Sequence, residues 1–385
     1  MSDLRRIVVV GGGIAGVTAA DALRQNGFDG ELTIVGDERH AAYSRPALSK
    51  AVLRDPDGLT AHELPPATHG GTELRGVAAV GLDVDARTVL LDDGDRLPYD
   101  GVVIASGCRA RRLGDEEADA ADELTLRTVD DAWRLRSRVA DRPSVVVVGG
   151  GPLGMEVASS CLDNGCEVTL VSQGPPLLAQ LGSHLSTLFV SAATHRGLRV
   201  VESAGARLAA GTSGTRVVLA EGVVIEAGLV ITAVGDRPNV EWLDGSGLLE
   251  RGSLVTDARG RVRPEVVAAG DVASVPTPRG IRRVPLWSSA IDQARTAAAA
   301  LLGVDPVPGD HRPYFWTEQF GLSLKAVGHL PLPGDPELLE GEPDGARQLL
   351  RWNAADASIG SAAVALNYRI PIPRLRRLCE PAVTG

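Results

Sequence analysis

The stretch that decides the fold is IVVVGGGIAG at Ile7–Gly16, which recurs as VVVVGGGPLG at Val145–Gly154. In each copy an apolar run of strand length ends in G-x-G-x-x-G, and a helical pattern follows. A second apolar strand comes after each helix. We therefore predict that one local unit, the first βαβ of a dinucleotide-binding domain, occurs twice. The predicted helices span 17–26 and 155–164, and the predicted second strands span 31–35 and 167–171.

Each of the three glycines in a loop has its own structural role. The first makes a tight turn, the second lets the backbone approach a pyrophosphate, and the third lets the helix pack on the strand. The helix N-terminus then faces the phosphates with its partial positive charge. Pro152 fits at the opening of the second helix, because its missing N–H costs nothing there. The glycines are Gly11, Gly13, Gly16, Gly149, Gly151 and Gly154.

The ends of the two second strands differ. An acidic residue there would hold the ribose hydroxyls of an adenosine, and the first copy supplies Asp37 and Glu38. The second copy supplies Ser172 and Gln173, so the carboxylate that favours a free ribose and repels a 2′-phosphate is missing. We therefore expect the two sites to hold different nucleotides. Asp37 could alternatively cap a turn.

Strands outside the two units indicate how the domains are arranged. Apolar strands at 88–91 and 102–104 are expected to form a hairpin around the turn 92–95. Buried strands at 229–234 and 266–269, each followed by glycine, suggest that the first domain resumes after the second closes.

The predicted architecture is α/β, with two Rossmann-like dinucleotide-binding domains, the second inserted in the first, and a small C-terminal α+β domain. A Pro/Gly-rich linker at 304–309 precedes the last. The first domain is expected to take residues 1–110 and 235–305, the second 111–234, and the C-terminal domain 306–385.

Composition excludes several function classes. Of 385 residues 44% are hydrophobic and 23% are charged, as in an ordinary globular protein of about two to three domains. The net charge of −10 disfavours non-specific binding to the phosphate backbone of a nucleic acid. Because no apolar run reaches the roughly 18 residues that span a bilayer and no signal segment precedes the first strand, we expect a cytoplasmic protein without membrane partners.

The cysteines indicate neither a disulfide framework nor a metal site. Cys108, Cys161, Cys166 and Cys379 lack metal-ligand spacing and are expected to be small buried side chains. A redox role for Cys161 and Cys166 is the alternative, although a predicted helix and its exit would make them face each other poorly.

Further motifs, in order along the chain, complete a family signature. The sequence resembles the single-chain, FAD-dependent ferredoxin reductases of bacterial oxygenase systems, of the putidaredoxin-reductase and biphenyl-dioxygenase-reductase type, from about Ile7 to Gly328. Besides the glycine loops, the motifs are VGDE at Val35–Glu38, YSRPALSK at Tyr43–Lys50, IASG at Ile104–Gly107, LRT at Leu126–Thr128, AGDV at Ala269–Val272 and FWTEQ at Phe315–Gln319.

The resemblance implies an FAD site on the first domain. Gly11, Gly13, Ala15 and Gly16 would surround the pyrophosphate, and Asp37 would bind the adenosine ribose. Asp271 would hydrogen-bond the ribitol chain, with the N-cap of a following helix as an alternative or additional role. The remaining implied FAD contacts are Arg45, Ala79, Arg127, Trp287 and Trp316, of which either tryptophan could instead be ordinary core.

The resemblance also implies that Lys50 reaches the flavin ring near its reactive nitrogen and pairs with Glu156. Such a cation would stabilise the negative charge that builds on the ring during reduction. Lys50 is one of two lysines in the chain, and a solvated loop lysine is the alternative. Related disulfide reductases need a cysteine near the flavin, and residues 43–50 contain none.

At the second site the resemblance implies a nicotinamide dinucleotide. Gly149, Gly151, Pro152 and Gly154 would cradle it, and Gly235 would let the nicotinamide approach the flavin. Ser172 stands where the family has an acid, so the choice between NADH and NADPH stays open.

The implied function is conversion of a hydride from NADH or NADPH into single electrons for a ferredoxin, an acidic iron-sulfur protein. The docking candidates are the arginines at 109, 111, 112, 282, 283, 374, 376 and 377, which could alternatively be solvated surface residues. A monomer or weak homodimer is expected. Two rival functions stay open: a flavin oxidoreductase acting directly on a small molecule or oxygen, and a flavin-binding protein whose second site has decayed.

Overall fold

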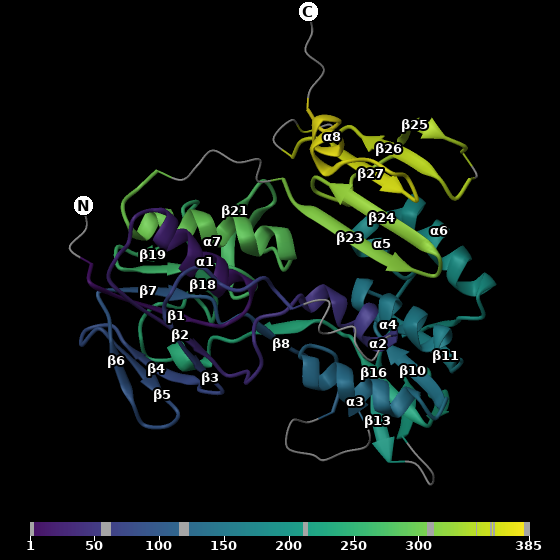
Figure 1. Cartoon of the computed structure of the whole chain (residues 1–385). Helices are drawn as coiled ribbons and strands as arrows, with labels where there is room; N and C mark the ends of the chain where they lie inside the picture. The colour runs from purple at the N-terminus through teal and green to yellow at the C-terminus, as the bar shows by residue number, and fades with distance from the viewer. Residues whose placement is uncertain are drawn as a thin grey trace, which may run out of the picture. The chain divides into compact units, whose positions relative to one another are not determined.

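The computed structural model describes residues 4–54, 63–114, 123–210, 215–305, 312–343, 345–354, 356 and 359–380. The chain divides into two compact units (Figure 1). The first unit comprises Met1–Ser44, His62–Arg109 and Arg237–Pro313, and the second comprises Arg45–Ala61, Ala110–Asp236 and Tyr314–Gly385.

A six-stranded sheet in the order β19-β20-β7-β1-β2-β3 forms the centre of the first unit. Its β1 lies between β2 and β7 and pairs with both in parallel, so its valines are buried on both faces. The strands are β1 (Arg6–Val10), β2 (Glu31–Gly36), β3 (Thr72–Arg75), β7 (Gly101–Ile104), β19 (Arg261–Arg263) and β20 (Val266–Ala268).

The two faces of this sheet build two separate cores. Ile7 and Val9 point to one face, where they pack with residues of α1 (Ile14–Gln25) and α7 (Trp287–Leu301), which lie against each other (Figure 1). Val8 and Val10 point to the other face, because successive strand side chains alternate. That face is covered by the sheets β4-β5-β6 and β18-β21-β22 and by a short 3-10 helix.

The turn at 92–95 joins different strands from those predicted. It connects β5 to β6, whereas residues 102–104 belong to β7 of the parallel sheet, so the predicted hairpin between 88–91 and 102–104 was wrong. The short strand β6, with its Arg and Pro, carries no apolar run that would have revealed it. The remaining strands of this unit are β4 (Ala79–Asp83), β5 (Thr88–Leu91), β6 (Arg96–Pro98), β18 (Leu254–Val255), β21 (Ala273–Thr277) and β22 (Gly280–Arg283), and the 3-10 helix η3 spans Glu241–Leu243.

The second unit repeats the parallel arrangement in a five-stranded sheet, β12-β11-β10-β16-β9. Its helix α4 (Pro152–Asp163) follows β10 as α1 follows β1. The strands are β9 (Glu123–Leu124), β10 (Ser144–Val148), β11 (Glu167–Ser172), β12 (Arg199–Glu202) and β16 (Leu229–Thr232). The other helices are η1 (Arg45–Ala47), α2 (Ala51–Arg54), α3 (Val129–Val139), α5 (Leu178–Leu181) and α6 (Ser183–His195).

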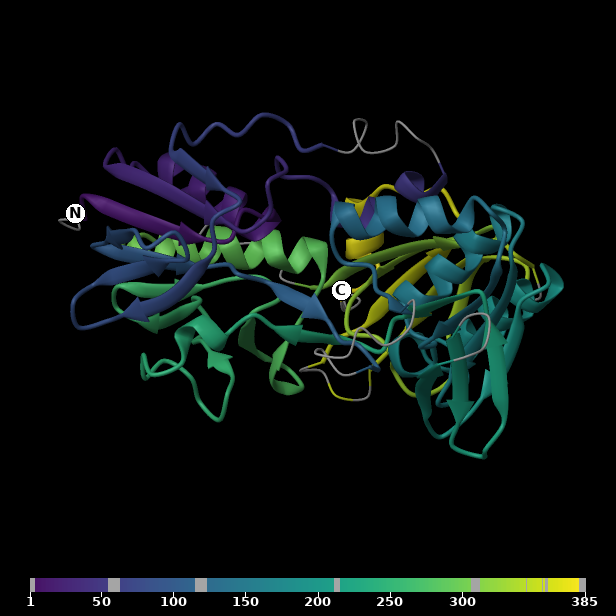
Figure 2. The ribbon, with the colours of Figure 1, turned by 90° about the horizontal axis from the view of Figure 1, so that it is seen from below.

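An antiparallel sheet β13-β14-β15 shares a hydrophobic core with this five-stranded sheet. It is seen in teal at the lower right of Figure 2. Its strands are β13 (Ala206–Ala210), β14 (Thr215–Leu219) and β15 (Val224–Ala227). The remaining two-stranded sheet pairs β8 (Cys108–Ala110) with β17 (Asp236–Pro238).

The C-terminal part of the second unit is a five-stranded antiparallel sheet, β23-β24-β27-β26-β25, with α8 (Ile372–Arg377) packed on it. Its strands are β23 (Tyr314–Gln319), β24 (Leu322–Val327), β25 (Glu337–Gly341), β26 (Gln348–Trp352) and β27 (Ala362–Leu366). Of the expected linker at 304–309, residues 306–309 lie outside the described residues.

The two βαβ units match residue by residue. Val10 stands opposite Val35, and Val148 stands opposite Val171 in the same parallel register. The first glycine of each loop donates its N–H to that opposite valine, Gly11 at 2.7 Å and Gly149 at 2.8 Å. Both predicted helices are present, although each begins three residues earlier and ends one residue earlier than predicted. Both second strands are present and continue one residue further than predicted.

A substitution at the third glycine of either loop tests this close packing. A Cβ on Gly154 would lie 1.9 Å from the Gly149 carbonyl oxygen, so we expect Gly154→Ala to lower the melting temperature by several degrees, equivalent to about 1–3 kcal/mol of overpacking. Gly205→Ala is the control, because its Cβ would meet nothing closer than 4.0 Å. Differential scanning calorimetry measures both. Equal melting temperatures for the two variants would contradict the packing.

The buried Tyr99 side chain should make the stability of the protein depend on pH in the alkaline range. Burial, reinforced by the charge of Glu265, raises the pKa of Tyr99 to about 12. An unfolded tyrosine ionises near pH 10. The contribution of the buried phenol to the free energy of unfolding is therefore complete below about pH 10 and is lost as the pH rises towards about 12. Tyr99→Phe should remove this component. Urea unfolding at pH 8 and pH 11 measures the free energy of unfolding at each pH. Between the two, this free energy should fall less in the variant than in the parent chain, and equal decreases would contradict the role of Tyr99.

Candidate functional site

The first glycine loop is a tight turn held by backbone contacts. Gly11 has a φ of 121°, and a Cβ there would lie 2.1 Å from the Ala105 carbonyl oxygen. A Cβ on Gly16 would lie 1.8 Å from the Gly11 carbonyl oxygen. Helix α1 begins directly after Gly13, whose position as N-cap leaves the first-turn N–H groups without a side-chain cap. The loop therefore presents uncapped backbone donors, as an anionic phosphate group requires.

The other sequence-predicted residues of the first unit occupy distinct places. Asp37 follows β2 and is exposed, while the neighbouring Glu38 accepts a hydrogen bond of 2.5 Å from the Tyr43 hydroxyl. Ala79 begins β4. Trp287 is the first residue of α7 and is half-buried.

Asp271 lies near the first loop but does not cap a helix. The chain continues from Asp271 into β21, so the expectation of a helix starting there was wrong. Its carboxylate accepts a hydrogen bond of 3.5 Å from the Cys108 thiol. The preceding Gly270 is close to the first loop, because a Cβ there would lie 2.9 Å from the Cβ of Ala15.

The second glycine loop repeats the geometry of the first. Gly149 has a φ of 122°, and a Cβ there would lie 2.2 Å from the Ala233 carbonyl oxygen. Pro152 is the first residue of α4, and Gly151 precedes it as the N-cap without a side-chain cap. A Cβ on Gly151 would meet nothing closer than 4.0 Å, so this side of the loop is open to a ligand. Gly235, with a φ of 104°, has open space beside its Cα within the described residues.

Ser172 and Gln173 follow the register of the first unit. Since Val171 corresponds to Val35, Ser172 takes the place of Gly36 and Gln173 takes that of Asp37. The Ser172 hydroxyl packs over Gly150, where a Cβ would lie 2.2 Å from it, and Ser172 is 8% exposed. The Gln173 amide donates to the Ala204 carbonyl oxygen at 3.2 Å. The spacing along the sequence did not predict that Ser172 is buried against the loop whereas the side chain of Gln173 bonds to the Ala204 carbonyl oxygen.

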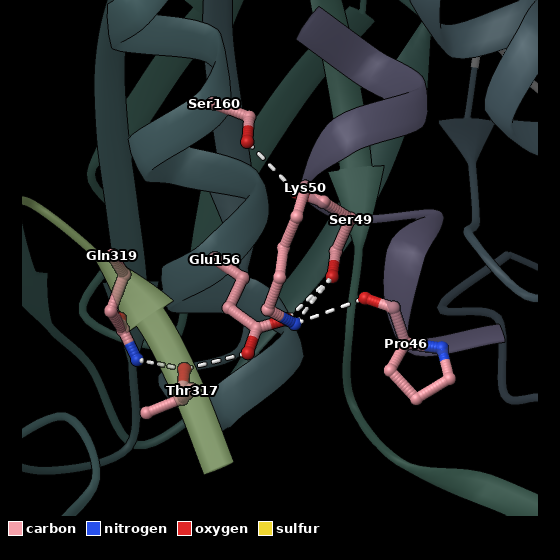
Figure 3. Close-up of polar contacts among 7 residues, drawn as sticks. All are labelled: Pro46, Ser49, Lys50, Glu156, Ser160, Thr317 and Gln319. Carbon is pink, nitrogen blue, oxygen red and sulfur yellow. Dashed lines mark hydrogen bonds and ion pairs between the residues drawn. The ribbon is translucent and has the colours of Figure 1, made fainter. Parts of the chain in front are cut away.

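A buried ion pair occupies the second turn of α4 (Figure 3). The Lys50 ammonium lies 2.7 Å from Oε2 of Glu156, and their side chains are 12% and 7% exposed. Lys50 also donates to the Pro46 carbonyl oxygen at 3.1 Å. The buried carboxylate and ammonium satisfy each other, as buried charges must.

Hydroxyl groups complete the environment of the Glu156 carboxylate. Ser49 donates to Oε2 at 2.5 Å, and Thr317 donates to Oε1 at 2.6 Å. The Gln319 amide in turn donates to the Thr317 hydroxyl at 2.9 Å. Thr317 and Gln319 belong to the motif FWTEQ, for which the sequence predicted a role only at Trp316. The sequence carried no local signal for their role, because the face of β23 that meets α4 is set by tertiary packing.

The remaining predicted residues of the second unit lie on β23, in η1 and just before α3. Trp316 stacks on Tyr314 with ring centroids 5.6 Å apart and planes 19° apart. Arg45 donates to the Arg127 carbonyl oxygen at 2.8 Å, so these two predicted residues are neighbours.

Two of the four cysteines, Cys161 and Cys166, are poorly suited to the redox role considered for them. Burial raises the pKa of Cys161 to about 12 and also raises the pKa of Cys166, which disfavours the nucleophilic thiolate. Within the described ranges, no group of three or more His, Cys, Asp or Glu side chains could hold a metal ion. No helix in the same ranges is long and apolar enough to cross a bilayer.

Several candidate docking arginines already have partners within their own unit. Arg109 pairs with Glu241 at 2.5 Å, and Arg112 lies 3.4 Å from the carboxylate of Glu123. Hydrogen bonds from Arg282 and Arg283 go to the backbone carbonyls of Arg279 and Asp271. On α8, Arg374 lies 4.0 Å from Glu340 on the protein surface.

Comparison with known proteins agrees with this geometry. The family model described as pyridine nucleotide-disulphide oxidoreductase matches residues 5–294. The chain is 33% identical to the ferredoxin–NAD(+) reductase component of the p-cumate 2,3-dioxygenase system of Pseudomonas putida, over 94% of this chain and 90% of that protein. It is 35% identical to rhodocoxin reductase of Rhodococcus erythropolis, over 88% of this chain and 81% of that one.

Solved structures give the same result. A chain in the crystal structure of the covalent putidaredoxin reductase–putidaredoxin complex is similar, with a TM-score of 0.86 and 26% identity, over 97% of this chain and 93% of that chain. With its two matched glycine loops and its match to the family model over most of its length, the chain belongs to the pyridine nucleotide-disulphide oxidoreductase family.

Proposed function

We propose that the chain is an FAD-dependent reductase that takes a hydride from NADH or NADPH and passes single electrons to a [2Fe-2S]-type or related ferredoxin serving an oxygenase. The observation that carries this proposal is the paired set of glycine turns, each leading into an uncapped helix N-terminus. One such turn suits one dinucleotide, and the chemistry needs two. One relative is a ferredoxin–NAD(+) reductase component of a dioxygenase system, and another is a rhodocoxin reductase, which supports this proposal.

The first unit supplies residues that fit FAD. Gly11, Gly13, Ala15 and Gly16 would hold its pyrophosphate, because the loop exposes backbone N–H groups and allows no side chain between them and a ligand. Asp37 is exposed beside this loop and would bind the adenosine ribose. The further proposed FAD contacts are Arg45, Ala79, Arg127, Asp271, Trp287 and Trp316.

The second loop fits a nicotinamide dinucleotide. Gly149, Gly151, Pro152 and Gly154 would hold its pyrophosphate, since the Gly151 side of the loop is open. Gly235 would leave room for the nicotinamide. Ser172, with its neighbour Gln173, would face the adenosine ribose.

The proposed domain roles follow from these sites. Residues 1–110 and 235–305 would bind FAD, and residues 111–234 would bind NADH or NADPH. Residues 306–385 would serve as an interface domain. We place the protein in the cytoplasm.

Lys50 and Glu156 are the proposed catalytic residues. FAD supplies the redox chemistry when bound, taking up two electrons with a hydride and releasing them one at a time. The Lys50 ammonium would stabilise the negative charge that accompanies reduction. Glu156 fixes the direction of that ammonium through a 2.7 Å contact, and the burial of both groups keeps water from screening it.

The acceptor would dock through positive charge on a chain that is negative overall. An arginine paired with a carboxylate, such as Arg109 or Arg374, adds little net charge. The more suitable candidate is therefore Arg282, which donates to the neutral carbonyl oxygen of Arg279. Such an encounter would be weak and sensitive to salt. A monomer or a weak homodimer would suffice for it.

Replacing the buried ion pair should slow ferredoxin reduction. In Lys50→Met/Glu156→Gln the cation is lost without leaving an unpaired buried charge, and we expect turnover to fall by about tenfold or more with FAD retained. The assay is cytochrome c reduction through an added [2Fe-2S] ferredoxin with NADH or NADPH as reductant. Arg196→Met/Asp163→Asn is the matched control, since it removes a surface ion pair of the same 2.7 Å length from the same helix.

Two outcomes of this assay count against the proposal. Parental turnover in the Lys50→Met/Glu156→Gln variant would contradict the role of the ion pair. Cytochrome c reduction that proceeds equally well without ferredoxin would instead favour a flavin oxidoreductase that acts directly on small molecules.

The choice between NADH and NADPH can be tested at the end of β11. Ser172→Asp or Gln173→Asp would place a carboxylate beside the proposed ribose position, where it accepts hydrogen bonds from a free ribose and repels a 2′-phosphate. We expect either variant to shift the kcat/KM ratio towards NADH by about tenfold or more. An unchanged ratio in both variants would show that this strand end does not contact the ribose.

A further inference from the structure

Strand β23 presents two polar side chains to the interior. Thr317 is 0% exposed and Gln319 is 2% exposed, whereas Glu318 between them is exposed. Burying a hydroxyl and an amide costs free energy unless both find hydrogen-bond partners. Two such residues in one strand therefore indicate a constraint other than core packing.

The direction of the hydrogen bonds around Thr317 is determined by its partners. The Gln319 amide nitrogen can only donate, so the Thr317 oxygen accepts that bond. The single hydroxyl hydrogen of Thr317 is left for Oε1 of Glu156, 2.6 Å away. The chain of donors therefore runs from Gln319 through Thr317 to the carboxylate (Figure 3).

The two carboxylate oxygens have separate tasks. Oε2 accepts hydrogen bonds from both Lys50 and Ser49, whereas Oε1 accepts one from Thr317. With Oε1 held, the carboxylate has one orientation, and Oε2 points at the ammonium. Without that bond the carboxylate could rotate about its terminal torsion, which is broad in energy.

The position of Thr317 is itself fixed against α4. The backbone N–H of Phe320, directly after β23, donates to the Ser159 hydroxyl at 2.8 Å. Ser159 lies one helical turn beyond Glu156, so β23 and α4 are joined at two successive places. On the opposite side of the pair, Ser160 donates to the Ser49 carbonyl oxygen at 2.8 Å and anchors the segment that carries Lys50.

We propose that Thr317 is a positioning residue for the reaction: its hydroxyl holds Glu156 in the orientation that directs the Lys50 ammonium. This inference rests on the proposed function, because it assigns Thr317 to the ion pair that the reductase reaction would use. It extends the functional machinery from Lys50 and Glu156 to β23 of the C-terminal sheet.

The test compares Thr317→Val with Thr317→Ser in the purified FAD-containing protein. Valine removes the hydroxyl and keeps the shape, and serine keeps the hydroxyl. In anaerobic stopped-flow mixing with saturating NADH or NADPH, we expect the limiting rate of flavin reduction to fall about tenfold in Thr317→Val, with the half-saturating nucleotide concentration unchanged. Thr317→Ser should stay within about twofold of the parent. Thr215→Val is the control, because it removes a buried threonine hydroxyl from a different strand, β14. This variant should leave the rate of flavin reduction unchanged.

A spectroscopic measurement separates positioning from general weakening of the fold. With ¹³C-labelled glutamate, the infrared difference between the parent and Glu156→Gln isolates the carboxylate stretch of Glu156. That band should move in Thr317→Val and stay in place in Thr317→Ser. If valine at 317 prevents folding, Gln319→Leu is the second variant, because it removes the amide that orients the hydroxyl and should also slow reduction.

The outcomes are distinguishable. A parental rate and an unmoved band in Thr317→Val, or a parental rate in Gln319→Leu where that variant is needed, would overturn the positioning role. Serine at 317 as slow as valine would overturn it as well. Failure of the parent protein to be reduced by either nucleotide would overturn the proposed reductase function itself, and with it the role of Thr317.

Discussion

The constraint on which the rest of the structure depends is the distance between each helix start and the strand before it. At Gly16 and Gly154 the helix lies so close to the preceding turn that a Cβ would fall 1.8 and 1.9 Å from a backbone carbonyl oxygen. That approach directs the first N–H groups of α1 and α4 past the strand ends, where a phosphate can bind them. Because the constraint occurs twice, the chain has two nucleotide-binding geometries.

Helix α4 combines two tasks in one rigid element. Its first turn follows the second glycine loop, and its second turn carries Glu156 to the Lys50 ammonium. One turn later, Ser159 and Ser160 fasten the helix to β23 and to the segment before α2. A nucleotide bound at the helix start and a charge held in its middle would therefore keep a constant separation. The buried carboxylate makes this arrangement sensitive to single hydroxyl groups, because an unsatisfied charged acceptor is far more costly than an unsatisfied neutral one.

Sequence reasoning reached the parts of the fold that depend on local pattern. The glycine loops, the valine strands and the helices between them could be predicted because each signal lies within about 30 residues, the length of one βαβ unit. The strand partner of 88–91 could not, since β6 has no apolar run and β7 has the same composition as any buried strand. A helix after Asp271 was a reasonable expectation from the Gly-Asp pair, yet the chain continues into a strand that is stabilised by its two partners, β18 and β22. The positions of Thr317 and Gln319 depend on which face of β23 meets α4, and that is a tertiary property.

The most direct measurement of the central claim is an anaerobic titration of the purified protein, prepared with ample riboflavin, by NADH and by NADPH. We predict a yellow protein with one FAD per chain, whose flavin absorbance is bleached stoichiometrically by at least one of the two nucleotides. A colourless protein that takes up no FAD, or a flavin that neither nucleotide bleaches, would contradict it.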